Sequence, residues 1–364
     1  MNCNFRSLFC LLILTMSCLT GINVAWGQKD FGADLMQTMM LTSKAFRAAA
    51  QKVRPSLVTI ESFGGVSAVQ GRIGGIRKQG EGNTTGLVIS KEGHIISSSF
   101  NFIQSPPVIT VITSDGKRRF AKLLGRDETR KICLLKINSY PEIELPEVIP
   151  VEDVSVGQWA ISVGVGYGDA NPAISTGIIS AVNRVGGRAI QTDANTSPAN
   201  YGGPLLDIEG RVMGICVPLN PQSAAVGAGV EWYDSGIGFA IPLSSLGEII
   251  ERMKKNERIY PAFLGVQTEP GAKGNGVGVV EVIAKSAAEE AGVSKGDTIL
   301  KLNGSKVNDL QELRKVLKRF EAGMEIEIEF ASAEDEEVKK AKVVLGRPPA
   351  PKEEVSPMEP PKIQ

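Results

Sequence analysis

Short apolar segments recur along residues 56–242, and turn-forming residues separate them. They are rich in β-branched residues or alternate apolar with polar residues, which is typical of strands. The segments are Ser56 to Ser62, Thr85 to Ser90, His94 to Ser98, Val108 to Thr113, Arg119 to Leu124, Ile132 to Ile137, Trp159 to Val163, Ala173 to Val182, Arg188 to Thr192, Pro204 to Asp207, Val212 to Val217 and Gly238 to Ile241. A series of short strands at this spacing favours closed β-barrels or a sandwich. We therefore expect a mostly β fold.

Length and charge limit the function classes. With 364 residues and 42% hydrophobic content, the chain can bury a sizeable core and should hold about two domains, at roughly 150 residues per domain. Lys plus Arg and Asp plus Glu are equal at 40 each, and aromatic residues make up 5%. No long-range field therefore attracts nucleic acid. We expect no nucleic-acid partner.

Residues 1–27 have the pattern of a signal peptide. Arg6 supplies a positive start, Leu8 to Met16 form an apolar core, and Ala25-Trp26-Gly27 offers small residues for cleavage. The apolar run is short for a membrane span. This pattern predicts export to the periplasm or cell envelope, with an uncleaved anchor as the alternative.

Residues 28–55 are predicted to be an N-terminal helical segment. Apolar residues recur at helical spacing from Asp34 to Val53, and Pro55 ends the pattern.

Two cysteines remain beyond the signal peptide, Cys133 and Cys216. Both lie in apolar strand-like runs, so buried free thiols are expected, although an oxidising compartment also permits a disulfide between them. Neither has His or Cys neighbours with metal-ligand spacing. We expect no metal and no cofactor.

The stretch from Gln191 to Asp207 contains the turn Ala199-Asn200-Tyr201-Gly202-Gly203-Pro204 between two strand-like runs. It resembles the nucleophile loop of the HtrA (Deg) family of trypsin-fold serine proteases, where a Gly-Asn-Ser-Gly-Gly-Pro turn presents the attacking serine. The runs Ser175 to Ala181 and Gly236 to Pro242 match the family in the same order. The resemblance implies two packed six-stranded β-barrels over residues 56–255.

The same resemblance implies that the catalytic residues are substituted. Tyr201 stands at the serine position, and Ala199 replaces the glycine that precedes Asn200 in the oxyanion loop. The family's histidine position, after the run Gly93 to Ser99, falls on Phe100. Its aspartate position, before the Ile132 to Lys136 strand, falls on Lys131.

The sequence offers no second histidine as the missing base. A Ser and Lys dyad with Ser197, Ser98 or Ser99 is an alternative, but none of these serines stands at the elbow position, so solvated or strand-capping hydroxyls are favoured. The chain has one histidine, His94, six positions before Phe100, and we expect it in a turn or on the surface. A tyrosine with its ordinary pKa near about 10 is a poor nucleophile, unless Lys131 activates Tyr201. Loss of such a nucleophile or base costs on the order of 10⁶ in turnover. We therefore expect no catalysis, with an endopeptidase that uses non-standard residues as the alternative.

Residues 260–346 are predicted to form a PDZ domain. Phe263-Leu264-Gly265-Val266 resembles the loop whose backbone amides bind a peptide's C-terminal carboxylate. Ser286 to Gly304 is similar to the middle of bacterial PDZ domains. Asp309 to Phe320 has the pattern of an amphipathic helix, and its Leu313 and Leu317 are candidates for the peptide groove, beside the loop.

The resemblance also implies the partners. We expect the PDZ domain to bind unfolded polypeptides or C-terminal peptides in envelope protein quality control. We further expect that the chain forms a homo-trimer, or that it is a structural subunit that assembles with active homologues and modulates them. Residues 347–364 are Pro-rich and predicted to be disordered.

Overall fold

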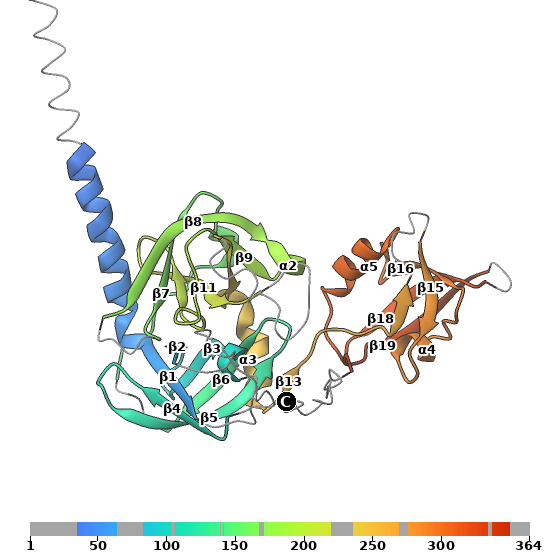
Figure 1. Cartoon of the computed structure of the whole chain (residues 1–364), viewed down its shortest axis with the longest axis horizontal. Helices are drawn as coiled ribbons and strands as arrows, with labels where there is room; N and C mark the ends of the chain where they lie inside the picture. Colours follow the sequence, from blue (N-terminus) through green and yellow to red (C-terminus); the bar gives the residue numbers. More distant parts are fainter. Residues whose placement is uncertain are drawn as a thin grey trace, which may run out of the picture.

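The computed structural model describes residues 35–63, 83–102, 106–138, 140, 142–166, 171–219, 236–268, 276–333 and 337–349. A helix, a double-barrel domain and a smaller sheet domain follow one another along the chain (Figure 1). The predicted signal peptide and nearly all of the predicted disordered tail lie outside the described residues.

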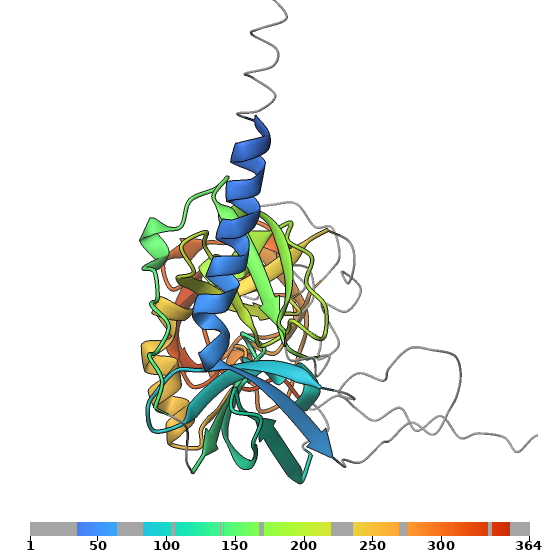
Figure 2. The same ribbon diagram turned by 90° about the vertical axis from the view of Figure 1, so that its left-hand side faces the viewer.

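The N-terminal helix spans residues 35–53 and extends away from the double-barrel domain (Figure 2). Its last turns are buried through Ala49, Ala50 and Val53. The Phe46 ring packs edge-on against Trp159, with 5.2 Å between the ring centroids. The apolar residues of the helix's C-terminal part thus attach it to the barrels.

The first barrel contains six strands that alternate apolar and polar residues or are wholly buried. They are β1 (Leu57–Phe63), β2 (Thr84–Val88), β3 (His94–Ser98), β4 (Val108–Ile112), β5 (Arg118–Asp127) and β6 (Ile132–Ile137). Hydrogen bonding follows the order β5-β4-β1-β2-β3-β6, and pairing of β5 with β6 closes the barrel. Closure leaves no unpaired edge in this barrel.

The second barrel is closed in the order β10-β11-β12-β9-β8-β7. Its strands are β7 (Trp159–Gly164), β8 (Ala173–Asn183), β9 (Ala189–Thr192), β10 (Pro204–Leu206), β11 (Val212–Val217) and β12 (Gly238–Pro242). The predicted mostly β fold with two six-stranded barrels is therefore confirmed. Cys133 on β6 and Cys216 on β11 are buried free thiols, one in each barrel.

A short connection joins the barrels to the last domain. The 3-10 helix η5 (Leu243–Leu246) and α3 (Gly247–Lys254) lead to β13 (Arg258–Ile259), which pairs in parallel with β5. The last domain's sheet has the order β14-β15-β16-β18-β19, and β17 pairs with β16. Its elements are β14 (Val266–Thr268), β15 (Val277–Val282), α4 (Ala287–Glu290), β16 (Thr298–Leu302), β17 (Ser305–Lys306), α5 (Leu310–Leu317), β18 (Glu325–Ala331) and β19 (Val338–Val344).

Helix α5 is shorter than the predicted Asp309 to Phe320. The Asp309 side chain caps it by accepting a hydrogen bond from the Glu312 amide at 2.8 Å, which fixes where the helix begins. Leu313 and Val316 are buried in the domain core.

Candidate functional site

The structure places Phe100 and Tyr201, two of the three positions predicted to replace catalytic residues, in direct contact. Phe100 lies in the 3-10 helix η2 (Ser99–Phe102) that follows β3, and Tyr201 lies in the turn before β10. Their rings meet edge-on with 5.4 Å between centroids and 65° between planes. Phe100 is 7% exposed and Tyr201 is 4% exposed. The aromatic pair is therefore a buried contact between η2 and the turn before β10.

Lys131 lies beside the same helical turn. Its carbonyl accepts a hydrogen bond from the Ser99 amide at 2.8 Å and one from the Ser98 hydroxyl at 3.3 Å. The side chain is buried, and this burial lowers the pKa of Lys131 below its ordinary value. The three positions thus lie in one region of the fold, and their correspondence to a catalytic triad stays a prediction.

The loop that holds Tyr201 forms a closed turn. The amides of Asn200 and Tyr201 both donate to the Ser197 carbonyl, at 2.8 Å and 3.0 Å. An oxyanion hole requires backbone amides that point at the developing negative charge instead of at an internal acceptor. Ala199 and Asn200 are also buried. In this arrangement the Tyr201 amide is not directed at a substrate.

Two threonines of the other barrel hold this loop in place. The Thr84 hydroxyl donates to the Tyr201 carbonyl at 2.7 Å, and the Thr85 hydroxyl donates to the Ala199 carbonyl at 2.6 Å. Both hydroxyls lie on β2, so the contact joins the two barrels. The sequence analysis missed these residues, because a pair of threonines at the start of a strand carries no distinguishing signal.

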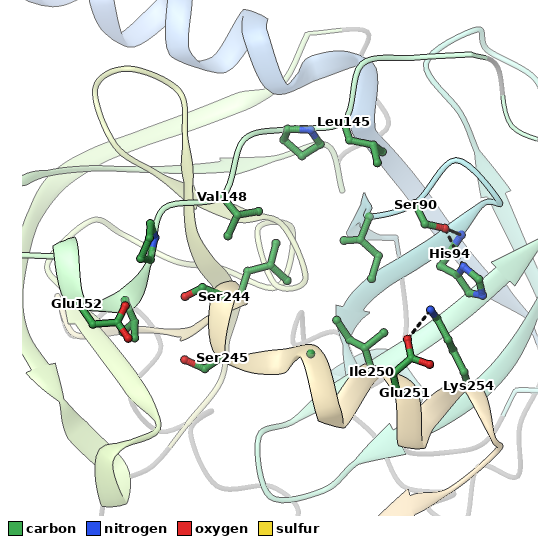
Figure 3. Close-up of a pocket in the computed structure, with 16 residues that line it drawn as sticks. Ser90, His94, Leu145, Val148, Glu152, Ser244, Ser245, Ile250, Glu251 and Lys254 are labelled. Atoms are coloured by element: carbon green, nitrogen blue, oxygen red, sulfur yellow. Dashed lines mark hydrogen bonds and ion pairs between the residues drawn. The ribbon is translucent and has the colours of Figure 1, made fainter.

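The single histidine does not belong to this region. His94 begins β3, and the Ser90 hydroxyl lies 2.7 Å from its Nδ1. Burial, with a contribution from nearby Lys254, lowers the pKa of His94. His94 lines a groove of about 710 Å³ that includes none of Phe100, Lys131 and Tyr201 (Figure 3). We expected this histidine in a turn or on the surface, and it lies half-buried at the start of a strand.

In the last domain, the predicted carboxylate-binding loop lies next to an edge strand. Gly265 adopts a left-handed φ of +87°, and its carbonyl accepts a hydrogen bond from the Ile283 amide at 2.8 Å. A Cβ atom at Gly265 would lie 2.1 Å from the Ser286 Cβ, so this position requires glycine. Among the described strands, β14 pairs with β15 alone, and an edge strand of this kind can accept an added peptide strand.

The predicted groove residues divide into two sets. Leu264 and Leu313 are 2% and 3% exposed and belong to the domain core. Phe263, Val266 and Leu317 are partly exposed and remain able to contact a peptide. Burial separates these sets, which the apolar pattern of the sequence cannot do.

Within the described residues, no cluster of three His, Cys, Asp or Glu side chains is arranged to hold a metal ion. No helix in the described ranges combines the length and apolarity needed to cross a membrane.

Two family models match the chain. Residues 84–215 match the trypsin-like peptidase domain, and residues 262–345 match the PDZ domain. The fold and these matches define the class: a trypsin-like peptidase domain followed by a PDZ domain. Within that class, the chain is similar to HtrA-type and DegP-like serine proteases.

The similar curated proteins carry protease names. A probable periplasmic serine endoprotease DegP-like of Rhizobium meliloti (strain 1021) is 29% identical over 270 residues, which are 70% of this chain and 51% of that protein. Protease Do-like 1, chloroplastic, of Arabidopsis thaliana is 29% identical over 285 residues, or 71% of this chain and 62% of that protein. The chain thus spans about half the length of the DegP-like relatives that it matches.

Solved structures show the same fold. The serine endoprotease from Yersinia pestis superposes with a TM-score of 0.61 at 22% identity, covering 83% of this chain and 97% of the other. HtrA-type protease AlgW with decapeptide gives a TM-score of 0.62 at 22% identity, covering 84% and 99%.

Proposed function

We propose that this chain is a non-catalytic relative of exported HtrA-type proteases, which binds unfolded polypeptides or exposed C-termini through its PDZ domain. Its role would be protein quality control in the periplasm or cell envelope. The contact between Phe100 and Tyr201 carries the proposal, because it occupies the position expected for a base and a nucleophile. The DegP-like relatives' names include the word periplasmic, which supports an exported location.

The chemistry of the site argues against acyl transfer. Hydrolysis of this kind needs a nucleophile, a base that accepts its proton and donors for the oxyanion. Tyr201 offers a buried phenol, and the only histidine lines a different groove. The Tyr201 amide donates to Ser197. These observations argue against a conventional nucleophile and base, and against the Tyr201 amide as an oxyanion donor.

The PDZ domain supports the binding part of the proposal. The amides of Leu264 and Gly265 make no hydrogen bond within the described part of the chain and are free to receive a carboxylate. β14 runs directly from this loop, so a peptide could add beside it while its terminus meets the amides. We propose Phe263, Val266 and Leu317 as the side chains that contact the peptide.

A casein-cleavage assay at high protein concentration tests the lack of catalysis. We expect no turnover above background from the wild-type chain. The Tyr201→Phe variant is the matched control, because it removes the phenolic hydroxyl and keeps the aromatic ring. Turnover that is present in the wild type and lost in this variant would establish the second candidate, an endopeptidase with non-standard residues. The endoprotease names of the relatives favour that candidate.

Peptide-array binding tests the PDZ function. We expect peptides with free C-termini to bind and amidated versions to bind much more weakly, because the amide lacks the carboxylate charge. Binding should be lost in Gly265→Glu. If the arrays show no binding and the chain co-purifies with an active homologue, the role would be that of a modulating subunit.

A further inference from the structure

Positively charged side chains gather where the double-barrel domain meets the PDZ domain. They come from α2 (Arg184–Gly187) and the residue after it, and from the C-terminal half of α5 and the residues after it. The six side chains, which we call the α2–α5 basic surface, are Arg184, Arg188, Arg314, Lys315, Lys318 and Arg319. The whole chain carries equal numbers of basic and acidic residues, so this concentration of positive charge is a local feature.

The two parts of the basic surface are in contact across the domain boundary. Figure 1 shows α2 on the side of the double-barrel domain that faces α5. A Cβ atom at Gly186 would lie 3.1 Å from the Lys318 carbonyl oxygen. The Arg188 guanidinium donates to the Phe320 carbonyl at 3.0 Å. Arg314 lies four residues before Lys318, so the two side chains are neighbours on one face of the helix.

Most of this charge has no acidic partner. Five of the cations form no ion pair with any residue that the structure describes: Arg184, Arg188, Arg314, Lys315 and Arg319. Arg184 donates to the neutral side-chain oxygen of Gln191 at 2.8 Å. Burial, with repulsion from Arg130, lowers the pKa of Arg188 to about 10, so this guanidinium remains charged at neutral pH.

The carboxylates on the same elements do not offset the charge. Residues 183–192, which include α2, contain no Asp or Glu. In the first turn of α5, Asp309 and Glu312 accept hydrogen bonds from backbone amides. Glu321, after α5, is already paired with both Arg130 and Arg252. The α2–α5 basic surface therefore keeps a net positive charge.

The basic surface adjoins the proposed peptide groove. Val266 on β14 and Leu317 on α5 pack against the same hydrophobic core. A β-bridge between Pro261 and Glu321 brings the carboxylate-binding loop close to the C-terminal end of α5. A helix of eight residues is about 12 Å long, which equals about four residues of extended peptide. The last four residues of a peptide added beside β14 thus extend along α5.

We propose that the α2–α5 basic surface selects ligands of the PDZ groove by charge, and that it favours polypeptides with acidic side chains among their last four residues. This inference rests on the function proposed above and names the class of ligand. An exposed ion pair changes an affinity by up to about five-fold, so two acidic side chains near several cations should give a preference of about ten-fold. Because α2 belongs to the double-barrel domain, both domains take part in the selection.

An array of peptides with free C-termini, probed with the full chain, tests the proposal. Each peptide is present in three versions, with two Glu, two Gln or two Lys directly before the last residue. Fluorescence anisotropy then gives the affinities of the strongest binders. We expect the Glu version to bind about ten-fold more tightly than the Gln version and the Lys version to bind most weakly. About 0.5 M NaCl should remove most of this difference, because salt screens exposed charges.

The array separates this inference from the function on which it rests. Equal affinities for the three versions would overturn selection by charge and leave peptide binding by the PDZ domain in place. No binding of any peptide would instead refute the proposed peptide-binding function.

Two charge reversals locate the effect on the basic surface. Arg314→Glu in the PDZ domain and Arg184→Glu in the double-barrel domain should each reduce the preference for the Glu version about three-fold. Lys295→Glu is the matched control, because it changes the net charge equally at an exposed position between α4 and β16. Unchanged preference in Arg184→Glu would show that α2 does not take part, and an equal effect of all three reversals would show that only net charge matters.

An anionic lipid surface is the competing partner for a basic surface of this kind. Co-sedimentation with vesicles of phosphatidylglycerol and phosphatidylcholine measures lipid binding, and we expect the chain to remain in the supernatant. Binding to the vesicles that both Arg314→Glu and Arg184→Glu abolish would overturn the proposal in favour of lipid headgroups.

Discussion

At the scale of single residues, the Phe100–Tyr201 contact belongs to the buried core of the double-barrel domain. Both rings are nearly fully buried, and edge-on aromatic pairs add stability beyond their buried area. The two positions that the sequence analysis predicts to be substituted are therefore in direct contact in the fold.

Truncating Tyr201 should destabilise the protein. Tyr201→Ala is expected to lower the free energy of unfolding by about 3–4 kcal/mol, as for other large aromatic side chains removed from a core. Urea denaturation followed by tryptophan fluorescence measures this change. Tyr201→Phe keeps the ring contact with Phe100 and should cost much less. Equal losses in the two variants would show that the ring packing is not the source of the stability.

Restoring the three side chains should not restore hydrolysis. In the triple variant Phe100→His, Lys131→Asp and Tyr201→Ser, we expect the amides of residues 200 and 201 to keep their bonds to the Ser197 carbonyl. We expect its kcat/KM with a peptide substrate to stay within ten-fold of background. A quadruple variant that also carries Ala199→Gly tests this reason, because glycine lets the loop adopt backbone conformations that alanine resists. Strong activity in the triple variant alone would contradict the importance of the closed turn.

The two cysteines should be unreactive in the folded protein. Burial raises the pKa of Cys133 and of Cys216 to about 12, so almost no thiolate exists at pH 8. Iodoacetamide should label neither thiol in native buffer and both in urea, as mass spectrometry can show. Rapid labelling of the native chain would mean that one barrel opens readily.

At the scale of elements, the PDZ loop depends on one glycine. Gly265→Ala should weaken the binding of C-terminal peptides at least ten-fold, because the added Cβ meets Ser286 and the φ of +87° is strained for alanine. Gly278→Ala on β15 is the matched control, since a Cβ there meets no atom within 4 Å. Fluorescence anisotropy with a labelled peptide measures both variants. An unchanged affinity in Gly265→Ala would argue against this loop as the carboxylate site.

At the scale of the whole molecule, one buried carboxylate joins the two domains. Glu321, which follows α5 in the PDZ domain, is 4% exposed. It accepts hydrogen bonds from Arg130 at 2.7 Å and from Arg252 at 2.6 Å, both in the double-barrel domain. The Arg188 guanidinium also donates to the Phe320 carbonyl at 3.0 Å. These charge-assisted bonds fix the relative position of the domains.

The domain contact should weaken at acidic pH. Burial alone would raise the pKa of Glu321, but the bonds from Arg252 and Arg130 lower it below the ordinary value. A lowered folded-state pKa means that the stabilisation is present above the unfolded-state value of about 4.5 and is lost as pH falls through the folded-state pKa. Small-angle scattering should therefore show the radius of gyration increasing as the pH is lowered below the unfolded-state value of about 4.5.

A substitution distinguishes the contribution of Glu321 to the domain contact from that of other acidic groups. Glu321→Gln should show the larger radius already at pH 7 and lose about 1.5–3 kcal/mol of interdomain stability, the range for hydrogen bonds to charged groups. Glu325→Gln, at an exposed ion pair with Lys342 on the same domain, should behave like the wild type. Identical scattering from all three proteins would exclude Glu321 as the domain link.

The sequence alone indicated the strands of the double-barrel domain and a mostly β fold. The Ile132–Ile137 and Val212–Val217 segments were predicted with their observed bounds, because their β-branched and apolar residues are a local signal. The PDZ helix was predicted three residues too long at its C-terminus, since apolar spacing continues to Phe320 after the helix ends. The absence of a second histidine was likewise readable without coordinates.

Only the tertiary structure decided how the candidate site is closed. The Thr84 and Thr85 hydroxyls bond carbonyls more than a hundred positions away in the chain, and Arg130 meets Glu321 at a separation of 191 residues. Residue patterns report local periodicity, whereas these contacts depend on how two barrels and a third domain pack together. The sequence thus determines which side chains are available. Tertiary packing determines which backbone groups and charged groups these side chains bond.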